Sequence, residues 1–492
     1  MRGVTTVLAV AVLASLDGDG TRAARAADPL LARAIAVFAA AERADAVGAA
    51  TASTAQRQYD AARDLEVALP DMRYVSRACR PLARDLRAYA RGLVREAEGF
   101  DRLNARLARA GARRAADALD RLERHGLRCP TGRPPRGPGL VHELTRPRRG
   151  EAFFGTVADA RVCADEVVLF ANGRRVGRIA APPADFSFVL KARPGVYDLG
   201  VRQLRGGRVC WRTVSQDVYL LPRWAERGRP PWATDPGLVR RLAAVGEPYS
   251  GYAGLYVHDL ARGRAAGWNA DARFPAASTV KLGLLVATLQ RFSPHSHGAA
   301  LSYELETMAA WSSNLAANRL LRKLGDGSDT LGSRRVEATL RRMGARSSTY
   351  PGGYRVGTSA SDVQRQPPLV SARVTTARDL GRVMWLIHAA ALGRSDGRRA
   401  TGLAPGRARF ALGALLRWER GGANGGLVAP SLPRGMPIAQ KSGWLSAVRH
   451  TAALVYARTG PKIVVVLAYE PEIADATARA LGARVAAAAR LR

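Results

Sequence analysis

The chain has 492 residues, which is too long for one hydrophobic core, so two or three domains are expected. Its hydrophobic content of 47% is ordinary for globular protein and argues against global disorder. A net charge of +35 would suggest nucleic-acid binding, but only five residues are lysine, and the arginines are scattered over every segment. We therefore expect no specific nucleic-acid partner.

The first 26 residues have the features of a secretory signal peptide. Arg2 gives a positive start, Val4 to Leu16 is mostly apolar, and Ala24 to Ala26 supplies small residues for cleavage before Ala27. The apolar run is too short to span a bilayer comfortably, and an uncleaved anchor is the alternative. We expect a secreted, periplasmic or cell-envelope protein without a transmembrane segment after signal removal.

Four cysteines are present: Cys79, Cys129, Cys163 and Cys210. Export makes disulfides reasonable, and four cysteines permit three pairings. The segment boundaries favour Cys79–Cys129 and Cys163–Cys210. No Cys-x-x-Cys or His-x-x-x-His spacing occurs, so neither a metal site nor a cofactor is expected.

Residues 27–129 are predicted to form a small α-helical bundle. Apolar side chains recur at helical spacing at Leu82, Leu86, Tyr89, Leu93, Ala97, Phe100, Leu103 and Leu107. Gly111 is expected to break this run before a second stripe begins at Ala115. A periodic apolar stripe is normally core, so no chemistry is assigned to it.

The composition changes after residue 129. Residues 130–150 are rich in Pro, Gly and Arg and are predicted to be a linker. Residues 151–222 alternate apolar and polar side chains between turn signals such as Asn172-Gly173, which predicts an all-β, immunoglobulin-like module. Residues 223–235 are predicted to be a second linker.

Residues 236–492 are predicted to form an α/β domain. A hairpin is expected at 254–265 and a helix starting near Ser278, with further helices to about 420. Strand-like runs then follow at 437–441, 450–456 and 463–469, before a helix from about Glu472. Strands at both ends with helices between them predict one sheet assembled from distant parts of the chain.

Ser278-Thr279-Val280-Lys281 is the first segment that carries chemistry. Three residues place Lys281 one helical turn from Ser278, on the same face. A serine hydroxyl needs a base to take its proton, and a lysine of depressed pKa can do this whereas an arginine cannot. Ser-x-x-Lys alone is a weak signal, and a helix cap beside a solvated lysine is the alternative.

Two further segments strengthen the interpretation. Ser312-Ser313-Asn314 offers a second serine with an amide two residues later, and Lys441-Ser442-Gly443 lies on a predicted strand. The order Ser-x-x-Lys, Ser-x-Asn, Lys-Ser-Gly is the signature of β-lactamases and penicillin-binding proteins. Residues 236–492 therefore resemble the penicillin-recognising serine hydrolases, and most closely the class A serine β-lactamases.

The resemblance implies a role for each matching residue. Ser278 would be the acylated nucleophile, with Lys281 in its proton network, and Ser312 would pass a proton to the departing lactam nitrogen. Lys441 is the fourth predicted catalytic residue and, with Ser442, would hold the substrate carboxylate. The substrate-binding residues would be Asn314, Ser442, Gly443, Trp444 and Arg449. Backbone N–H groups of Ser278 and Trp444 would form the oxyanion hole, and Arg449 would anchor a substrate carboxylate, with an ordinary surface arginine as the alternative.

Three departures from the family pattern matter. Ser313 stands where the family usually has Asp, and Ser442 replaces Thr but keeps its hydroxyl. The family glutamate that activates the deacylating water is missing, because residues 338–373 contain no Glu and Asp362 is their only carboxylate. Asp362 is therefore the candidate deacylation base, with a side chain one methylene shorter.

The leading hypothesis is an exported β-lactamase-like hydrolase acting on β-lactams. A peptidoglycan D,D-peptidase or transpeptidase, which needs no such glutamate, is the first alternative and would bring a peptidoglycan peptide as substrate. A penicillin-binding or sensing module with little turnover, in contact with the cell wall, is the second.

Overall fold

The structure is a computed structural model of the full chain. It describes residues 29–48, 51–69, 79–125, 142–148, 152–158, 165–180, 185–187, 195–221, 223–292, 294–354, 356, 373–416 and 425–491. Two compact units divide the chain: residues 1–139 with 354–359, and residues 140–353 with 360–492.

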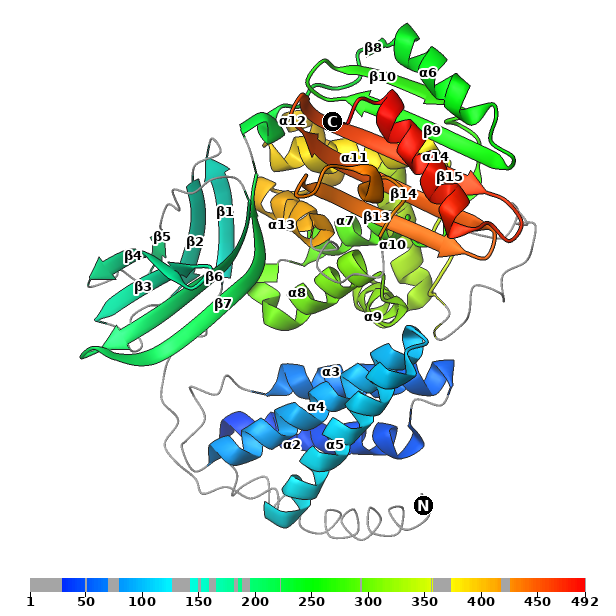
Figure 1. Ribbon diagram of the computed structural model, residues 1–492. Helices are drawn as coiled ribbons and strands as arrows, with labels where there is room; N and C mark the ends of the chain where they lie inside the picture. The colour runs from blue at the N-terminus through cyan, green and yellow to red at the C-terminus, as the bar shows by residue number, and fades with distance from the viewer. Residues whose placement is uncertain are drawn as a thin grey trace. The chain divides into compact units, whose positions relative to one another are not determined.

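Four helices make up the described part of the first unit and pack on one another in chain order (Figure 1). They are α2 (Pro29–Val47), α3 (Ala52–Ala68), α4 (Arg80–Asp101) and α5 (Ala105–His125). The turn between α4 and α5 falls at Leu103, whose φ is +52°, and not at Gly111 as the sequence analysis expected. Gly111 lies inside α5, and a Cβ there would lie 2.3 Å from the backbone nitrogen of Glu96. The glycine therefore permits close packing of two helices instead of ending one.

The predicted cysteine pairs are only partly within the described residues. Cys79 is disulfide-bonded and fully buried. Cys129 and Cys163 lie outside the described part of the chain, so both pairings stay predictions. The predicted signal peptide, residues 1–26, also lies outside it.

The second unit begins with two antiparallel sheets. One has the strand order β1-β2-β5 and the other β4-β3-β6-β7. The strands are β1 (His142–Arg148), β2 (Ala152–Ala158), β3 (Glu166–Ala171), β4 (Arg174–Ala180), β5 (Asp185–Ser187), β6 (Gly195–Arg205) and β7 (Arg208–Leu220). Asn172 and Gly173 both have positive φ, +48° and +78°, which is the two-residue hairpin turn that this dipeptide predicts. Assignment of these sheets to an immunoglobulin-like sandwich stays a prediction.

Parts of both predicted linkers are strands. β1 lies inside residues 130–150 and pairs with β2. β8 (Ala233–Thr234) ends the second linker and pairs in parallel with β10 (Arg264–Trp268). Proline- and arginine-rich composition pointed to loop in both places, but backbone pairing with a neighbouring strand overrides local preference.

The α/β domain predicted for residues 236–492 is built on one six-stranded sheet of order β13-β14-β15-β9-β10-β8. Its remaining strands are β9 (Tyr252–Asp259), β13 (Ile438–Leu445), β14 (Val448–Ala457) and β15 (Gly460–Tyr469). β9, from the start of the domain, pairs with β15 from its end along eight residues of each strand. The sheet therefore joins segments about 200 residues apart, as the sequence predicted.

Helices cover both faces of this sheet (Figure 1). α6 (Pro236–Gly246) and α14 (Asp475–Ala488) share one hydrophobic core with the sheet residues Leu255, Val257 and Val466. α11 (Ala377–Ala391) packs on the opposite face. The other helices are α7 (Lys281–Arg291), α8 (Pro294–Trp311), α9 (Asn314–Leu324), α10 (Asp329–Arg342), α12 (Ser395–Thr401) and α13 (Pro405–Leu416).

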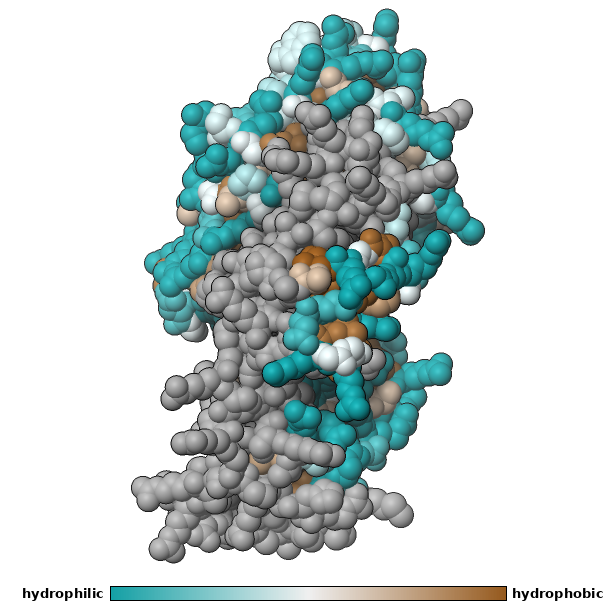
Figure 2. Space-filling model, turned by 90° about the vertical axis from the view of Figure 1, so that its left-hand side faces the viewer, coloured by the Kyte–Doolittle hydropathy of each residue, from teal (hydrophilic) through white to brown (hydrophobic). Residues whose placement is uncertain are grey.

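The described surface is polar where it can be seen. Among the residues coloured by hydropathy in Figure 2, hydrophilic ones predominate and the hydrophobic ones form small separate groups. Within the described ranges, no helix combines the length and the apolar character needed to cross a bilayer.

Candidate active site

A short two-stranded ladder anchors the first motif. β11 (Phe274–Pro275) pairs with β12 (Val374–Thr375), and the N–H of Ala276 donates to the carbonyl of Arg373 at 2.7 Å. The chain just before Ser278 is thus fixed to the chain just before α11, a segment about 100 residues away in sequence.

Ser278 lies in the turn that leads into α7, whereas the sequence analysis placed the helix start near it. α7 begins at Lys281, whose N–H donates to the carbonyl of Ser278 at 3.2 Å. This i→i−3 bond is typical of a tightened first turn. Ala277, the preceding residue, has φ of +48°, a conformation that costs a non-glycine residue about 1–3 kcal/mol. Backbone strain is therefore stored beside the predicted nucleophile, which is half-buried.

The side-chain nitrogen of Lys281 is buried and held by the second motif. Its side chain is 1% exposed, and Nζ donates to Asn314 Oδ1 at 2.7 Å and to the carbonyl of Ser312 at 2.5 Å. The hydroxyl oxygen of Ser312 lies 3.5 Å from the same nitrogen. These contacts place the first two motifs against each other.

The loop between α8 and α9 presents this second motif. Ser312 has φ of +59°, and Ser313 is the N-cap of α9, its hydroxyl accepting from the N–H of Ala316 at 3.2 Å. Ser313, which stands where the family usually has Asp, therefore still performs the capping that an aspartate would.

Lys441 approaches the same serine from the sheet. Its Nζ donates to Ser312 Oγ at 2.8 Å and to the carbonyl of Ser442 at 3.0 Å, and the residue is 1% exposed. Burial lowers the pKa of Lys441 to about 7, because a charged ammonium is poorly solvated there. This lysine can thus gain or lose a proton near neutral pH.

Gly443 brings the third motif against the first. A Cβ at Gly443 would lie 3.0 Å from the backbone nitrogen of Ser278 and 3.0 Å from the carbonyl oxygen of Ala276. Strand β13 therefore passes directly beside the turn that carries Ser278. Residues 278, 281, 312, 314 and 441 come together from three distant segments, and this arrangement offers a nucleophile, two amines that can carry protons, and a hydroxyl between them.

A sequence comparison agrees with this arrangement. The family model described as the beta-lactamase enzyme family matches residues 237–298 and 295–490. The chain belongs to this family.

Several solved structures are similar to about half of this chain at low sequence identity. PBP-A has a TM-score of 0.40 and 20% identity, covering 53% of this chain and 98% of that one. A β-lactamase from Sphaerobacter thermophilus DSM 20745 has a TM-score of 0.40 and 19% identity over 51% and 95%. One from Xanthomonas campestris pv. campestris str. ATCC 33913 has 0.41 and 20% over 51% and 96%. No curated protein sequence matches the chain.

Two of the substrate-binding residues that the family pattern predicts have unsatisfied polar atoms. Ser442 Oγ and Trp444 Nε1 are both buried and form no hydrogen bond with the part of the chain that the structure describes. Buried groups of this kind usually have a partner. A bound substrate would supply one, so both atoms are suitable for recognition.

Arg449 is engaged elsewhere. Its Nε donates to Asp475 Oδ1 at 2.7 Å, and Nη1 donates to the carbonyls of Leu445 and, at 2.9 Å, Val448. The guanidinium also stacks 4.9 Å from the ring centroid of Trp444. Anchoring a substrate carboxylate would require exchanging this ion pair, so that role stays a prediction. Asp362, the candidate deacylation base, lies outside the described residues.

His450 is a positioning residue that the sequence analysis missed. It is fully buried, its Nε2 donates to the carbonyl of Pro275 at 2.9 Å, and its Nδ1 accepts from the N–H of Ala468 at 3.1 Å. These two bonds fix the ring's tautomer and tie β14 and β15 to the strand that leads to Ser278. In the sequence, the feature that could have indicated this role is a histidine at an inward position of an otherwise apolar strand.

Proposed function

We propose that this chain is an exported serine hydrolase that opens β-lactam rings through an acyl-enzyme on Ser278. The observation that carries the proposal is the pair of buried lysines on one hydroxyl. Lys281 Nζ and Lys441 Nζ lie 3.5 Å and 2.8 Å from Ser312 Oγ. Such a chain of amines and a hydroxyl can move a proton from a nucleophile to a leaving nitrogen without help from solvent.

Acylation follows from this arrangement in two proton transfers. Ser278 Oγ attacks the lactam carbonyl carbon while neutral Lys281 accepts the hydroxyl proton. The carbonyl oxygen becomes an oxyanion, for which the backbone N–H groups of Ser278 and Trp444 are the proposed donors. The carbon–nitrogen bond then breaks, Ser312 gives its proton to the nitrogen, and Lys281 returns a proton to Ser312.

Lys441 has a supporting role in this scheme. Because its ammonium donates to Ser312 Oγ, the Ser312 proton is left to point towards the leaving nitrogen. The same positive charge, next to Ser442, would attract the carboxylate that β-lactams carry.

A second candidate function is a D,D-peptidase or penicillin-binding module that turns over slowly. It is favoured by the absence of Glu from residues 338–373, where the family has its deacylating base. Loss of a positioned base typically costs about two to four orders of magnitude in rate. Asp362 is the proposed substitute, and its shorter side chain predicts slow release of the acyl group.

One experiment separates these functions. Purified chain is incubated with a chromogenic cephalosporin while product and intact protein mass are followed together. Multiple turnovers support a β-lactamase, a persistent single adduct supports a penicillin-binding protein, and no adduct argues against both. Hydrolysis of a D-alanyl-D-alanine peptide is measured in parallel to detect peptidase activity.

Two variants assign the residues. Ser278→Ala should abolish the adduct, and a retained adduct would show that the nucleophile lies elsewhere. Asp362→Asn should slow turnover while leaving adduct formation intact; unchanged turnover would remove Asp362 from the mechanism.

Export is part of the proposal and rests on the sequence of residues 1–26. We expect cleavage after Ala26 when the full-length gene is expressed in a bacterium. The intact mass of the protein recovered outside the cytoplasm tests this, and a full-length mass would contradict it.

A further inference from the structure

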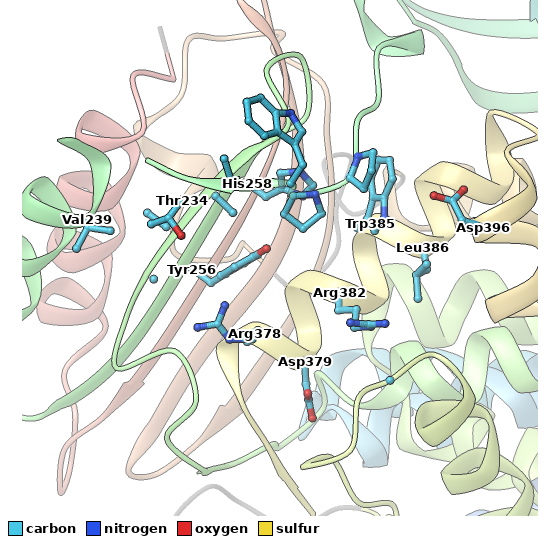
Figure 3. A pocket seen from close by; sticks show the side chains of 18 residues that line it. Thr234, Val239, Tyr256, His258, Arg378, Asp379, Arg382, Trp385, Leu386 and Asp396 are labelled. Carbon is cyan, nitrogen blue, oxygen red and sulfur yellow. The ribbon is translucent and has the colours of Figure 1, made fainter. Parts of the chain in front are cut away.

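A cavity lies in the same domain as the candidate active site, and none of the proposed catalytic residues lines it. Its volume is about 700 Å³, within the usual range for small-molecule sites. Side chains of β9, of α11 and of the segment Pro230–Thr234 surround it (Figure 3).

The floor of this cavity is set by the pleat of β9. Tyr256 and His258 are two residues apart and so share one face of the strand, while Leu255 and Val257 enter the core on the other face. The ring of Tyr256 packs against α11 at Gly381, where a Cβ would lie 2.3 Å from its Cδ1. The position of Tyr256 is therefore fixed by packing, and the cavity is preformed.

Polar atoms of the floor are only partly satisfied by the described residues. His258 is fully buried, and its ring interacts with the backbone of Arg229, but neither ring nitrogen forms a well-aligned hydrogen bond with the described residues. Tyr256 is 4% exposed, and its side chain lines the cavity (Figure 3). Leaving a buried ring nitrogen without a good hydrogen bond costs about 1–3 kcal/mol, so a ligand that bonded to His258 would regain that energy. Burial lowers the pKa of His258 to about 4, so the imidazole is neutral and offers one donor and one acceptor.

Arg382, a cation at the cavity, forms no direct ion pair with the described residues, although Asp379 attracts it through charge. Arg382 Nε donates to the carbonyl of Met343 at 2.7 Å, and its two terminal nitrogens contact no carboxylate among the described residues. By contrast, Arg378 is held by both oxygens of Asp271, at 2.6 Å and 2.9 Å. Arg382 is thus free to bind an anion in the forked geometry that guanidinium favours.

The carboxylates that line the cavity are already satisfied. Asp379 accepts from the N–H of Ser347 at 2.9 Å and from the hydroxyl of Ser348 at 2.8 Å. Asp396 is paired with Arg394 at 3.2 Å and 3.1 Å. Neither therefore competes with a ligand for Arg382 through a direct ion pair.

The remaining walls are apolar. Trp385 and Leu386 of α11 face the cavity together with Val239 of α6, and the Trp385 ring lies edge-on to His258 at 5.5 Å. An aromatic ring fits such walls, because aromatic pairs favour offset or edge-to-face contacts.

We propose that this cavity binds a small organic anion with an aromatic or apolar body. Its acidic group pairs with Arg382, and its polar atoms bond to the hydroxyl of Tyr256 and the imidazole of His258. This site is independent of the proposed hydrolase activity.

Two fluorescent probes that differ by one sulfonate group test the site on the full chain. 8-Anilinonaphthalene-1-sulfonate carries an anion, and N-phenyl-1-naphthylamine is the same body without it. Arg382→Gln should raise the Kd of the sulfonate about tenfold or more and leave that of the neutral probe unchanged. Tyr256→Phe should weaken the sulfonate about threefold without exposing the cavity, since it removes one hydroxyl.

Two controls place the probe. Arg399→Gln removes an exposed arginine of α12 that does not line the cavity, and should change neither Kd. Ser278→Ala should also leave both unchanged, because the catalytic residues do not contribute. Thermal unfolding of each variant checks that the fold is intact.

The proposal is overturned if Arg382→Gln leaves the sulfonate Kd within twofold of wild type. It is equally overturned if Arg399→Gln weakens the sulfonate as much, because binding would then reflect the general positive charge of the chain. If Arg382→Gln lowers the unfolding temperature, Tyr256→Phe decides: an unchanged sulfonate Kd in that variant rejects the site.

Discussion

The side-chain nitrogen of Lys441 donates a hydrogen bond of 2.8 Å to the hydroxyl of Ser312. Each of these residues comes from a different motif, and 129 positions separate them in sequence. Since burial lowers the pKa of Lys441 to about 7, the charge state of this contact changes in the physiological range.

The first prediction is a pH dependence of catalysis. As pH rises through about 7, Lys441 loses its proton, so kcat/KM for a β-lactam with a free carboxylate should fall. The methyl ester of the same β-lactam lacks the charge that Lys441 would attract and should show a flatter profile. Parallel falls for acid and ester would contradict a role for Lys441 in carboxylate binding.

The same pKa shift has a consequence for stability. Between about pH 7 and 10.5 the unfolded chain keeps a proton that folded Lys441 has released, so the contribution of Lys441 to the free energy of unfolding rises with pH. Lys441→Met should remove this dependence. Relative to wild type, the free energy of unfolding of the variant should therefore be higher at pH 6 than at pH 9, by on the order of 3 kcal/mol. Urea unfolding at the two pH values measures it, and equal differences would refute it.

The second prediction concerns Lys281 as the base that takes the proton from Ser278. Lys281→Arg keeps the positive charge but cannot lose a proton, so acylation of Ser278 should slow by about two to four orders of magnitude. Stopped-flow measurement of adduct formation gives the rate. Lys323→Arg, at an exposed position of α9, is the matched control and should acylate like wild type. Normal acylation by Lys281→Arg would exclude Lys281 as the proton acceptor.

The third prediction concerns the close approach at Gly443. Gly443→Ala places a Cβ 3.0 Å from the Ser278 nitrogen and should displace that turn, lowering the acylation rate about tenfold or more. Gly413→Ala is the matched control, because a Cβ at Gly413 meets nothing within 4 Å. That variant should stabilise α13 by up to about 1 kcal/mol and leave catalysis unchanged. Equal kinetics in the two variants would argue that β13 does not position Ser278.

The fourth prediction concerns His450. His450→Phe keeps an aromatic side chain but leaves the Pro275 carbonyl and the Ala468 N–H without their partner. The variant should therefore destabilise the fold by about 2–4 kcal/mol. Because Pro275 precedes Ser278 by three residues, kcat should fall more than KM changes. His388→Phe removes a buried imidazole bonded to Arg227 instead, and should destabilise without this kinetic effect.

His450 also predicts a loss of stability in acid. Burial lowers its pKa to about 4, so between pH 6.5 and 4 the unfolded chain binds a proton that the folded chain does not. The contribution of His450 to stability is therefore lost as pH falls through this window. Between pH 6.5 and 4 the free energy of unfolding of wild type should fall more steeply with decreasing pH than that of His450→Phe. Identical slopes would count against the buried neutral imidazole.

Local chemistry explains which features could be predicted from the sequence. The short, mostly apolar runs near 254–259, 450–456 and 463–469 predict buried strands, and those strands are present. Asn172-Gly173 permits positive φ at both positions, so its hairpin needs no tertiary information. The predictions failed where packing overrides composition. Gly111 was predicted to end a helix, but it lies inside α5 and allows close packing against α4. Residues 142–148 were predicted to be part of a linker, but they form β1 and pair with β2.

The order and spacing of Ser278, Lys281, Ser312 and Lys441 determined by themselves which reaction class to consider, because only certain side chains can attack, deprotonate and protonate. Tertiary structure alone decided that both lysines reach one serine, that Arg449 is held by Asp475, and that His450 holds the strand before Ser278. A hydrogen bond requires two atoms within about 3 Å, and for residues more than 100 positions apart that distance depends on how the whole sheet is assembled.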